Sequence, residues 1–154
     1  MFKTGEIIVH NKMGLCTIKE ITEFNGIEYY VLISSIDDTK IMIPKANSSK
    51  LIRKIITKQE IEELVTKIPE IEVEPIHDFK ARVKKYEELL KSGETEKLVI
   101  LLMMIYKHKK QNNNLTVADK EISKNAEKLL FDELGYVLNV NSNEVEKYLF
   151  KYAN

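Results

Sequence analysis

The chain has 154 residues, of which 44% are hydrophobic and 31% charged, and its formal net charge is zero. This length allows one ordinary domain or two small ones, and the composition is that of a globular protein. The longest apolar run, residues 98–106, is too short to cross a bilayer, and the single cysteine excludes an internal disulfide, so we expect a cytoplasmic protein without a membrane partner.

The N-terminal third of the chain carries the residue patterns of short β-strands. The strands are expected over residues 6–10, 15–24, 28–36, 40–43 and 51–53. Asn25-Gly26 separates the second strand from the third, and this dipeptide favours a hairpin because both central residues of a type I′ turn need a positive φ. Asp37-Asp38 marks the next turn, and Pro44 ends the fourth strand. Five such strands predict a small SH3-like or Tudor-like barrel.

The spacing of apolar residues changes at Thr57 from the alternation of strands to the spacing of helices. Thr57 and Glu60 form a capping-box pattern, which predicts the start of a helix. Pro69 and Pro75 enclose three glutamates, and a segment of this kind favours an extended acidic connection. We therefore expect residues 57–76 to form a helix and an acidic linker between two domains.

The rest of the chain shows helical spacing. Helices are expected over residues 78–91, 94–110 and 116–134, and from residue 142 onwards. Gly93 and Gly135 are expected to end the first and the third, while Thr116 and Ser142 are expected to cap the third and the fourth. The second helix contains the long apolar run and should be the buried centre of a compact bundle.

These elements predict an α+β protein with an uneven charge distribution. An N-terminal β-barrel (residues 1–56) is followed by the helix and acidic linker (57–76) and by an all-α domain (77–154). Residues 80–110 carry nine Lys/Arg and four Asp/Glu, so a basic segment follows the acidic linker. Charged helix faces are often simply solvated, so this segment alone does not establish a nucleic-acid site.

The sequence lacks the residue constellations of common enzymes. Its three histidines, His10, His77 and His108, lie far apart and have no metal-ligand spacing. There is no glycine-rich phosphate loop and no Gly-x-Ser-x-Gly motif. Cys16, within an expected strand, is interpreted as a packing residue. We therefore expect no enzyme activity, no metal, no cofactor and no small-molecule substrate, and a small enzyme of unknown class is a disfavoured alternative.

Three motifs accompany this layout. They are Phe2-Lys3-x-Gly5-Glu6-x-Ile8-Val9, Leu90-Lys91-Ser92-Gly93-Glu94 and Leu115-Thr116-x-x-Asp119-Lys120. Over nearly the whole chain, motifs and layout together resemble the CarD/CdnL family of bacterial transcription regulators. The first motif is similar to the opening strand of that family, the second to the junction between its first two C-terminal helices, and the third to the start of the next helix.

The resemblance implies a docking edge for RNA polymerase. In the family, the N-terminal module pairs a strand edge with a lobe of the polymerase β subunit, a β-augmentation in which main-chain hydrogen bonds give affinity. The corresponding edge would include Lys40, Ile41, Met42 and Ile43. The family often has arginine where Met42 stands, so Met42 either takes part in docking or packs within the domain.

The resemblance also implies a promoter DNA partner. In the family, the C-terminal domain binds the upstream edge of the transcription bubble, where a tryptophan acts as a wedge in the minor groove at the −10 element. This chain has no tryptophan, and the spacing to Ser92-Gly93 puts Phe79 at the equivalent position. An apolar wedge unstacks a base step, and phenylalanine would do so with less area than tryptophan. The alternative is that Phe79 packs at a helix start.

Basic residues near Phe79 complete the expected DNA site. They are Lys80, Arg82, Lys84 and Lys85, with Lys120 added because a helix N-terminus attracts phosphate. The predicted function is a transcription regulator that binds the polymerase β subunit and the upstream fork of promoter DNA and stabilises the open complex. The alternative is an adaptor that docks on polymerase without functional DNA binding, which the missing tryptophan and the neutral net charge favour.

Overall fold

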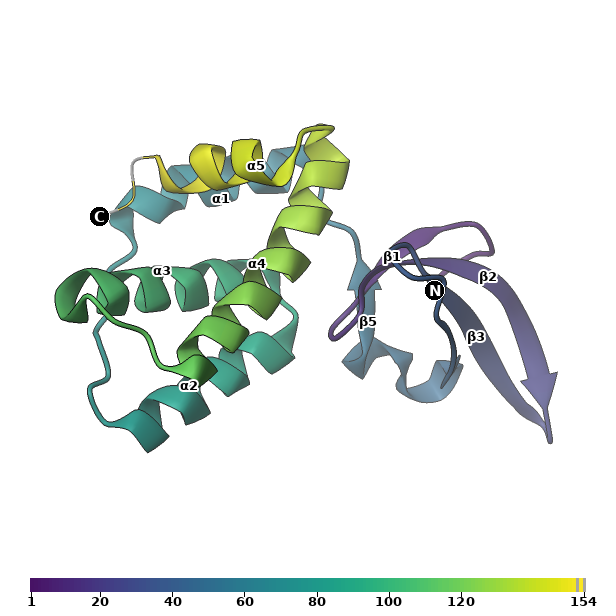
Figure 1. Ribbon diagram of the computed structural model, residues 1–154. Helices are drawn as coiled ribbons and strands as arrows, with labels where there is room; N and C mark the ends of the chain where they lie inside the picture. Colours follow the sequence, from purple (N-terminus) through teal and green to yellow (C-terminus); the bar gives the residue numbers. More distant parts are fainter. Residues whose placement is uncertain (152, 154) are drawn as a thin grey trace. The chain divides into compact units, whose positions relative to one another are not determined.

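The computed structural model describes residues 1–151 and residue 153, and divides the chain into two compact units, Met1–Ile55 and Ile56–Asn154. The first unit is built of strands and the second of helices (Figure 1). The α+β class expected from the sequence is therefore confirmed.

The first unit is an antiparallel sheet of five strands. They are β1 (Ile7–His10), β2 (Gly14–Phe24), β3 (Ile27–Ser34), β4 (Lys40–Pro44) and β5 (Ile52–Lys54), with the short 3-10 helix η1 (Lys45–Lys50) before β5. The strand order is β4-β3-β2-β1-β5. The sheet is thus open rather than the closed barrel expected from the strand count. Instead of a β4–β5 ladder, η1 connects these two edge strands and packs against both of them and β3.

The β2–β3 hairpin has the turn that the sequence predicts. Phe24 pairs with Ile27 across Asn25 and Gly26, whose φ angles are 50° and 78°. These positive values are those a type I′ turn requires, and glycine adopts them without a Cβ penalty. Further along the ladder the register shifts between Ile18 and Glu20, which marks a β-bulge.

One face of the sheet covers a small hydrophobic core. Its buried members are Ile8, Cys16, Ile18, Tyr30, Leu32, Ile43 and Ile52. Burial, assisted by the negative charge of Asp37, raises the pKa of the Cys16 thiol to about 11. Since the thiolate is the reactive form, Cys16 is an inert packing residue at neutral pH, as the sequence indicates.

The second unit contains five α-helices among its described residues. They are α1 (Lys58–Lys67), α2 (Phe79–Ser92), α3 (Thr95–Asn112), α4 (Val117–Leu138) and α5 (Ser142–Phe150), with the short 3-10 helix η2 (Ile68–Glu70) after α1. Figure 1 shows α3 lying between α1 and α2, with α4 running across them. Most of the apolar run is buried on α3, so the expected central helix is confirmed. No helix in the described part of the chain has the length and apolarity to cross a membrane.

The segment expected as a separate linker shares the core of the helical unit. The capping box at Thr57 is present and starts α1. Ile61, Leu64, Ile68 and Val73 are buried in the same cluster as the apolar residues of α3. An amphipathic helix must bury its apolar face, and α1 does so against the bundle.

The helix α4 runs past its expected end at Gly135 and stops at Leu138. Asn139 follows in the left-handed conformation with a φ of 57°, which is the other common way to end a helix. Gly135 is needed for space, because a Cβ on it would lie 2.8 Å from the carbonyl oxygen of Val140. The last helix is capped by the side chain of Asn141, one residue before the expected Ser142.

Candidate nucleic-acid and polymerase interfaces

The N-terminal end of α2 presents an aromatic side chain to solvent. The N-cap is Asp78, whose Oδ2 accepts a hydrogen bond from the backbone N–H of Ala81 at 3.0 Å. This cap fixes the first turn of the helix and makes Phe79 its first residue. The Phe79 side chain is 50% exposed. Its ring is therefore held at a helix end with half of its surface in water.

Arg82, one helical turn after Phe79, is turned inward. It is 4% exposed, and its guanidinium donates from Nε to Oδ1 of Asp119 (3.1 Å) and from Nη2 to Oδ2 (3.2 Å). Nη1 donates to the carbonyl oxygens of Ile76 (3.5 Å) and His77 (3.2 Å). The expectation that Arg82 contacts phosphate is therefore corrected, because its charge and donors are engaged within the protein.

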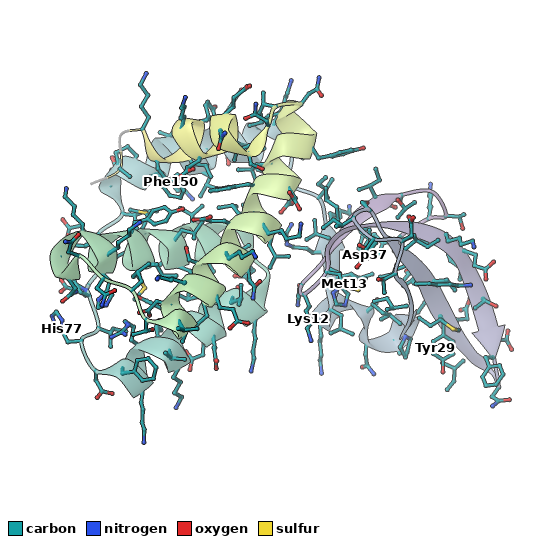
Figure 2. The ribbon with its side chains drawn as sticks, viewed as in Figure 1. Lys12, Met13, Tyr29, Asp37, His77 and Phe150 are labelled. Atoms are coloured by element: carbon teal, nitrogen blue, oxygen red, sulfur yellow. The ribbon has the colours of Figure 1, made fainter. Side chains whose placement is uncertain are left out.

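The same guanidinium lies beside the exposed ring. Its central carbon is 5.5 Å from the centroid of Phe79, a distance suited to a cation–π contact. Figure 2 shows His77 at the end of the segment that leads into α2. Arg82 therefore touches both the chain just before the helix and the aromatic side chain at its first position.

Asp119 belongs to the first turn of α4. It is fully buried and accepts hydrogen bonds at Oδ2 from the backbone N–H and the hydroxyl of Thr116, both at 2.9 Å. Burial opposes ionisation of Asp119, but the hydrogen bonds from Arg82 and Thr116 outweigh it and hold the pKa of this carboxyl below its usual value. Asp119 is therefore ionised at neutral pH, and its ion pair with Arg82 joins the N-terminal ends of α2 and α4.

The expected lysines are on the surface. Lys80, Lys84, Lys85 and Lys120 are all exposed. Lys80 and Lys84 lie four residues apart and so share one face of α2. Lys120 directly follows Asp119, whose carboxylate forms a capping box with Thr116 and adds a negative charge to this end of α4. A carboxylate at this position opposes the binding of phosphate to the helix end, so Lys120 would attract phosphate through its own charge.

Two features of this region were not deduced from the sequence. Val117, the first residue of α4, is 81% exposed, and it lies two positions before Asp119. An apolar residue directly after the cap Thr116 was the only available signal. The second feature is the partner of Arg82, since the motif Thr116-x-x-Asp119 was interpreted only as a helix start.

In the sheet unit, β4 is an edge strand, and among the described residues it pairs with β3 alone. Its side chains alternate between two faces. Ile41 and Ile43 pack on the core, whereas Met42 is 49% exposed and Lys40 is also exposed. Of the expected docking residues, Lys40 and Met42 therefore have side chains that a partner could reach. Ile41 and Ile43 offer a partner only their main-chain groups.

Two further exposed apolar residues lie beyond the buried Val31 on the face that carries Met42. Met42 pairs with Val31, and Ile27 lies on the same side of β3 four residues earlier. Ile27 is 48% exposed, and its cross-strand partner Phe24 is 63% exposed. The hairpin, whose β3 also carries Tyr29 (Figure 2), thus presents a second exposed apolar pair near its turn.

Comparison with known families matches both units. The CarD-like/TRCF RID domain matches residues 2–56, and the CarD C-terminal domain matches residues 55–150. No curated protein matches the chain. The two matched segments meet where the sheet unit gives way to the helical unit. The chain therefore belongs to the CarD/CdnL family, whose members are RNA polymerase-interacting transcription regulators.

Proposed function

We propose that the protein binds the RNA polymerase β subunit through the edge strand β4 and the upstream fork of promoter DNA through the start of α2, and that it thereby stabilises the open complex. The observation that carries this proposal is the half-exposed ring of Phe79 at the first position of α2. A large apolar side chain held in water beside exposed lysines fits a wedge for unstacked bases.

The polymerase half of the proposal rests on an unpaired edge. A strand of the β subunit added beside β4 would use main-chain hydrogen bonds along Lys40 to Ile43, while Lys40 and Met42 would select the partner. Natural sheets usually protect such edges, so an open and partly apolar edge is a reasonable docking surface. The exposed side chains of Ile27 and Phe24 would enlarge this surface.

The DNA half combines a wedge with a few phosphate contacts. Lys80, Lys84, Lys85 and Lys120 are exposed and would meet phosphates, which position a protein without reading sequence. Four contacts give weak and salt-sensitive binding to free DNA. Docking on polymerase would compensate, because it raises the effective DNA concentration at the start of α2.

The proposed effect on transcription follows from unequal affinity. Unstacking a base step costs a few kcal/mol in duplex DNA, but the cost is already met at an open fork. The wedge would therefore bind melted promoter more tightly than closed promoter, and only that difference shifts the equilibrium towards the open complex.

The direct experiment measures the lifetime of the open promoter complex with purified polymerase. Phe79→Ala should shorten the lifetime, and Phe79→Trp should lengthen it because the larger ring covers more base surface. Tyr136→Ala is the matched control, since Tyr136 is 55% exposed on α4, far along the helix from its N-terminal end. A lifetime that is the same for wild type and Phe79→Ala would overturn the wedge.

The adaptor remains the second candidate function. Asp78 is a negative charge directly beside Phe79, and Asp119 adds a negative charge at the end of α4, where the helix dipole favours phosphate. Both features oppose DNA binding. An adaptor would bind the β subunit with full affinity and leave the open-complex lifetime unchanged at every salt concentration.

A further inference from the structure

We infer that Arg82 is a positioning residue, which acts through Phe79 by holding its ring in one orientation at the start of α2. This inference rests on the proposed wedge function and adds to it a residue that does not itself touch DNA. It starts from the finding that the guanidinium of Arg82 is buried yet meets the ring of the exposed Phe79.

The guanidinium is held so fully that it can serve as a fixed support. Its three nitrogens make four hydrogen bonds, two to the carboxylate of Asp119 and two to the carbonyl oxygens of Ile76 and His77. Arginine presents its donors in a rigid planar fork that matches a carboxylate with two parallel bonds. A group fixed in this way has little freedom left to follow the ring.

The backbone is fixed both before and after Phe79, and this restrains its ring. The carbonyls of Ile76 and His77 tie the preceding chain to Arg82, and the Asp78 cap fixes the first turn of the helix. The cation at 5.5 Å from the ring centroid then favours one placement of the side chain. The rest of the ring, half of its surface, remains available to a base.

Preordering of this kind matters most for a small wedge. An exposed side chain loses rotamer freedom when it binds, and that loss weakens affinity. A ring that is already ordered loses less. Phenylalanine offers less contact area than the tryptophan implied by the family resemblance, so a larger share of its effect depends on such ordering.

The support also couples two helix ends. The Asp119 carboxylate that receives Arg82 is the one that caps α4 through Thr116. The start of α4, with exposed Val117 and Lys120, is therefore attached to the support of Phe79. Lysine at position 82 would retain the positive charge but not the fork, so it should fail to reproduce this arrangement.

The test is a double-mutant cycle between Arg82→Lys and Phe79→Ala, with open-complex lifetime as the measured quantity. With Phe79 present, Arg82→Lys should shorten the lifetime roughly two- to tenfold, the size expected when one side chain must be ordered on binding. In the Phe79→Ala background, the same change should leave the lifetime unaltered. Lys84→Gln is the control, which should shorten the lifetime equally in both backgrounds.

Salt dependence separates positioning from direct phosphate contact. A lysine that contacts phosphate lowers the salt slope of DNA binding by about 1 when removed. Lys84→Gln should do so, whereas Arg82→Gln should leave the slope as in the wild type. A reduced slope for Arg82→Gln, or equal lifetime losses from Arg82→Lys in the two backgrounds, would overturn the positioning role.

Failure of the wedge itself has a different signature, because Phe79→Ala would then have no effect at all. Folding is checked by circular dichroism and thermal unfolding of each variant. If Arg82→Lys does not fold, Asp119→Asn takes its place in the cycle, since it keeps the arginine and removes the negative charge that anchors it. The same carboxylate also takes part in the α4 cap with Thr116, so thermal unfolding of this variant is compared with that of Thr116→Ala, which disturbs the cap alone. A shorter lifetime only when Phe79 is present would then support the positioning role, and equal losses in the two backgrounds would overturn it.

Discussion

Arg82 and Asp119 are separated by 37 residues in sequence, and their side chains form an ion pair of 3.1 Å that is almost completely withdrawn from water. Removing one member of a buried pair leaves the other charged without compensation, which costs about 3–5 kcal/mol. We therefore expect Asp119→Ala to destabilise the helical unit by this amount in urea unfolding followed by circular dichroism.

The control for that experiment is an ion pair on the surface. Lys97 and Glu94 lie 3.1 Å apart with both side chains at least half exposed. Pairs of this kind contribute at most about 1 kcal/mol. Lys97→Ala should therefore change the free energy of unfolding only slightly, and an equal loss for both variants would contradict the special role of the buried pair.

The stability of the sheet unit should depend on pH through His10. Its Nδ1 accepts hydrogen bonds from the backbone N–H groups of Lys12 and Met13, both at 3.1 Å. In the folded state, burial and the positive charge of Lys12 lower the pKa of His10 below 6.5, its ordinary value. As pH falls below that value, the unfolded chain takes up a proton that the folded chain does not, so the free energy of unfolding decreases.

Thermal unfolding between neutral and mildly acidic pH measures this effect. His10→Asn, whose amide oxygen still accepts a hydrogen bond, should flatten the decrease in melting temperature. His77→Asn is the matched control, because His77 is exposed and lies in the helical unit, outside the sheet unit that contains His10. If His10→Asn retains the full slope, another group is responsible.

At Gly135 the structure predicts whether alanine raises or lowers the free energy of unfolding. In an exposed helix interior, replacing glycine by alanine stabilises a protein by about 1 kcal/mol. At Gly135 the added Cβ would lie 2.8 Å from the carbonyl oxygen of Val140, and the backbone would have to shift. We expect Gly135→Ala to lower the free energy of unfolding by about 1–3 kcal/mol. A stabilised variant would contradict this prediction, because it would show that the backbone at Val140 shifts at little cost.

The proposed polymerase contact makes a prediction at Met42. A glutamate at this half-exposed position would place a charge in an apolar docking surface, and Met42→Glu should weaken binding to the isolated β-subunit lobe about tenfold. Met42→Leu keeps the apolar character and should bind as the wild type does. Titration of the lobe with each variant gives the dissociation constants, and equal values would remove Met42 from the interface.

The sequence predicts those elements whose signals are local. Asn25-Gly26, Thr57 and Gly93 each act on their immediate neighbours, and the structure has the expected turn, capping box and left-handed helix end at these positions. Phe79 was proposed from the family resemblance, by its spacing to Ser92-Gly93, and the structure shows its ring half-exposed.

Features that depend on distant partners were not predictable in the same way. Arg82 looks like any basic residue of a helix until Asp119, 37 positions later, is brought beside it. The need for glycine at position 135 comes from the carbonyl of Val140 in the following turn, so the sequence suggested a helix end instead. Five strands close into a barrel only when the two edge strands pair with each other. That pairing depends on the tilt and stagger of all the strands, which no local pattern reveals.

The buried Cys16 gives the protein a built-in reporter. It is the chain's single cysteine, it is inaccessible, and its thiol remains protonated at neutral pH. A thiol reagent can therefore label the protein only when the sheet unit opens. Labelling rates in the presence and absence of the polymerase lobe would measure how much docking suppresses that opening, with no need for an introduced probe.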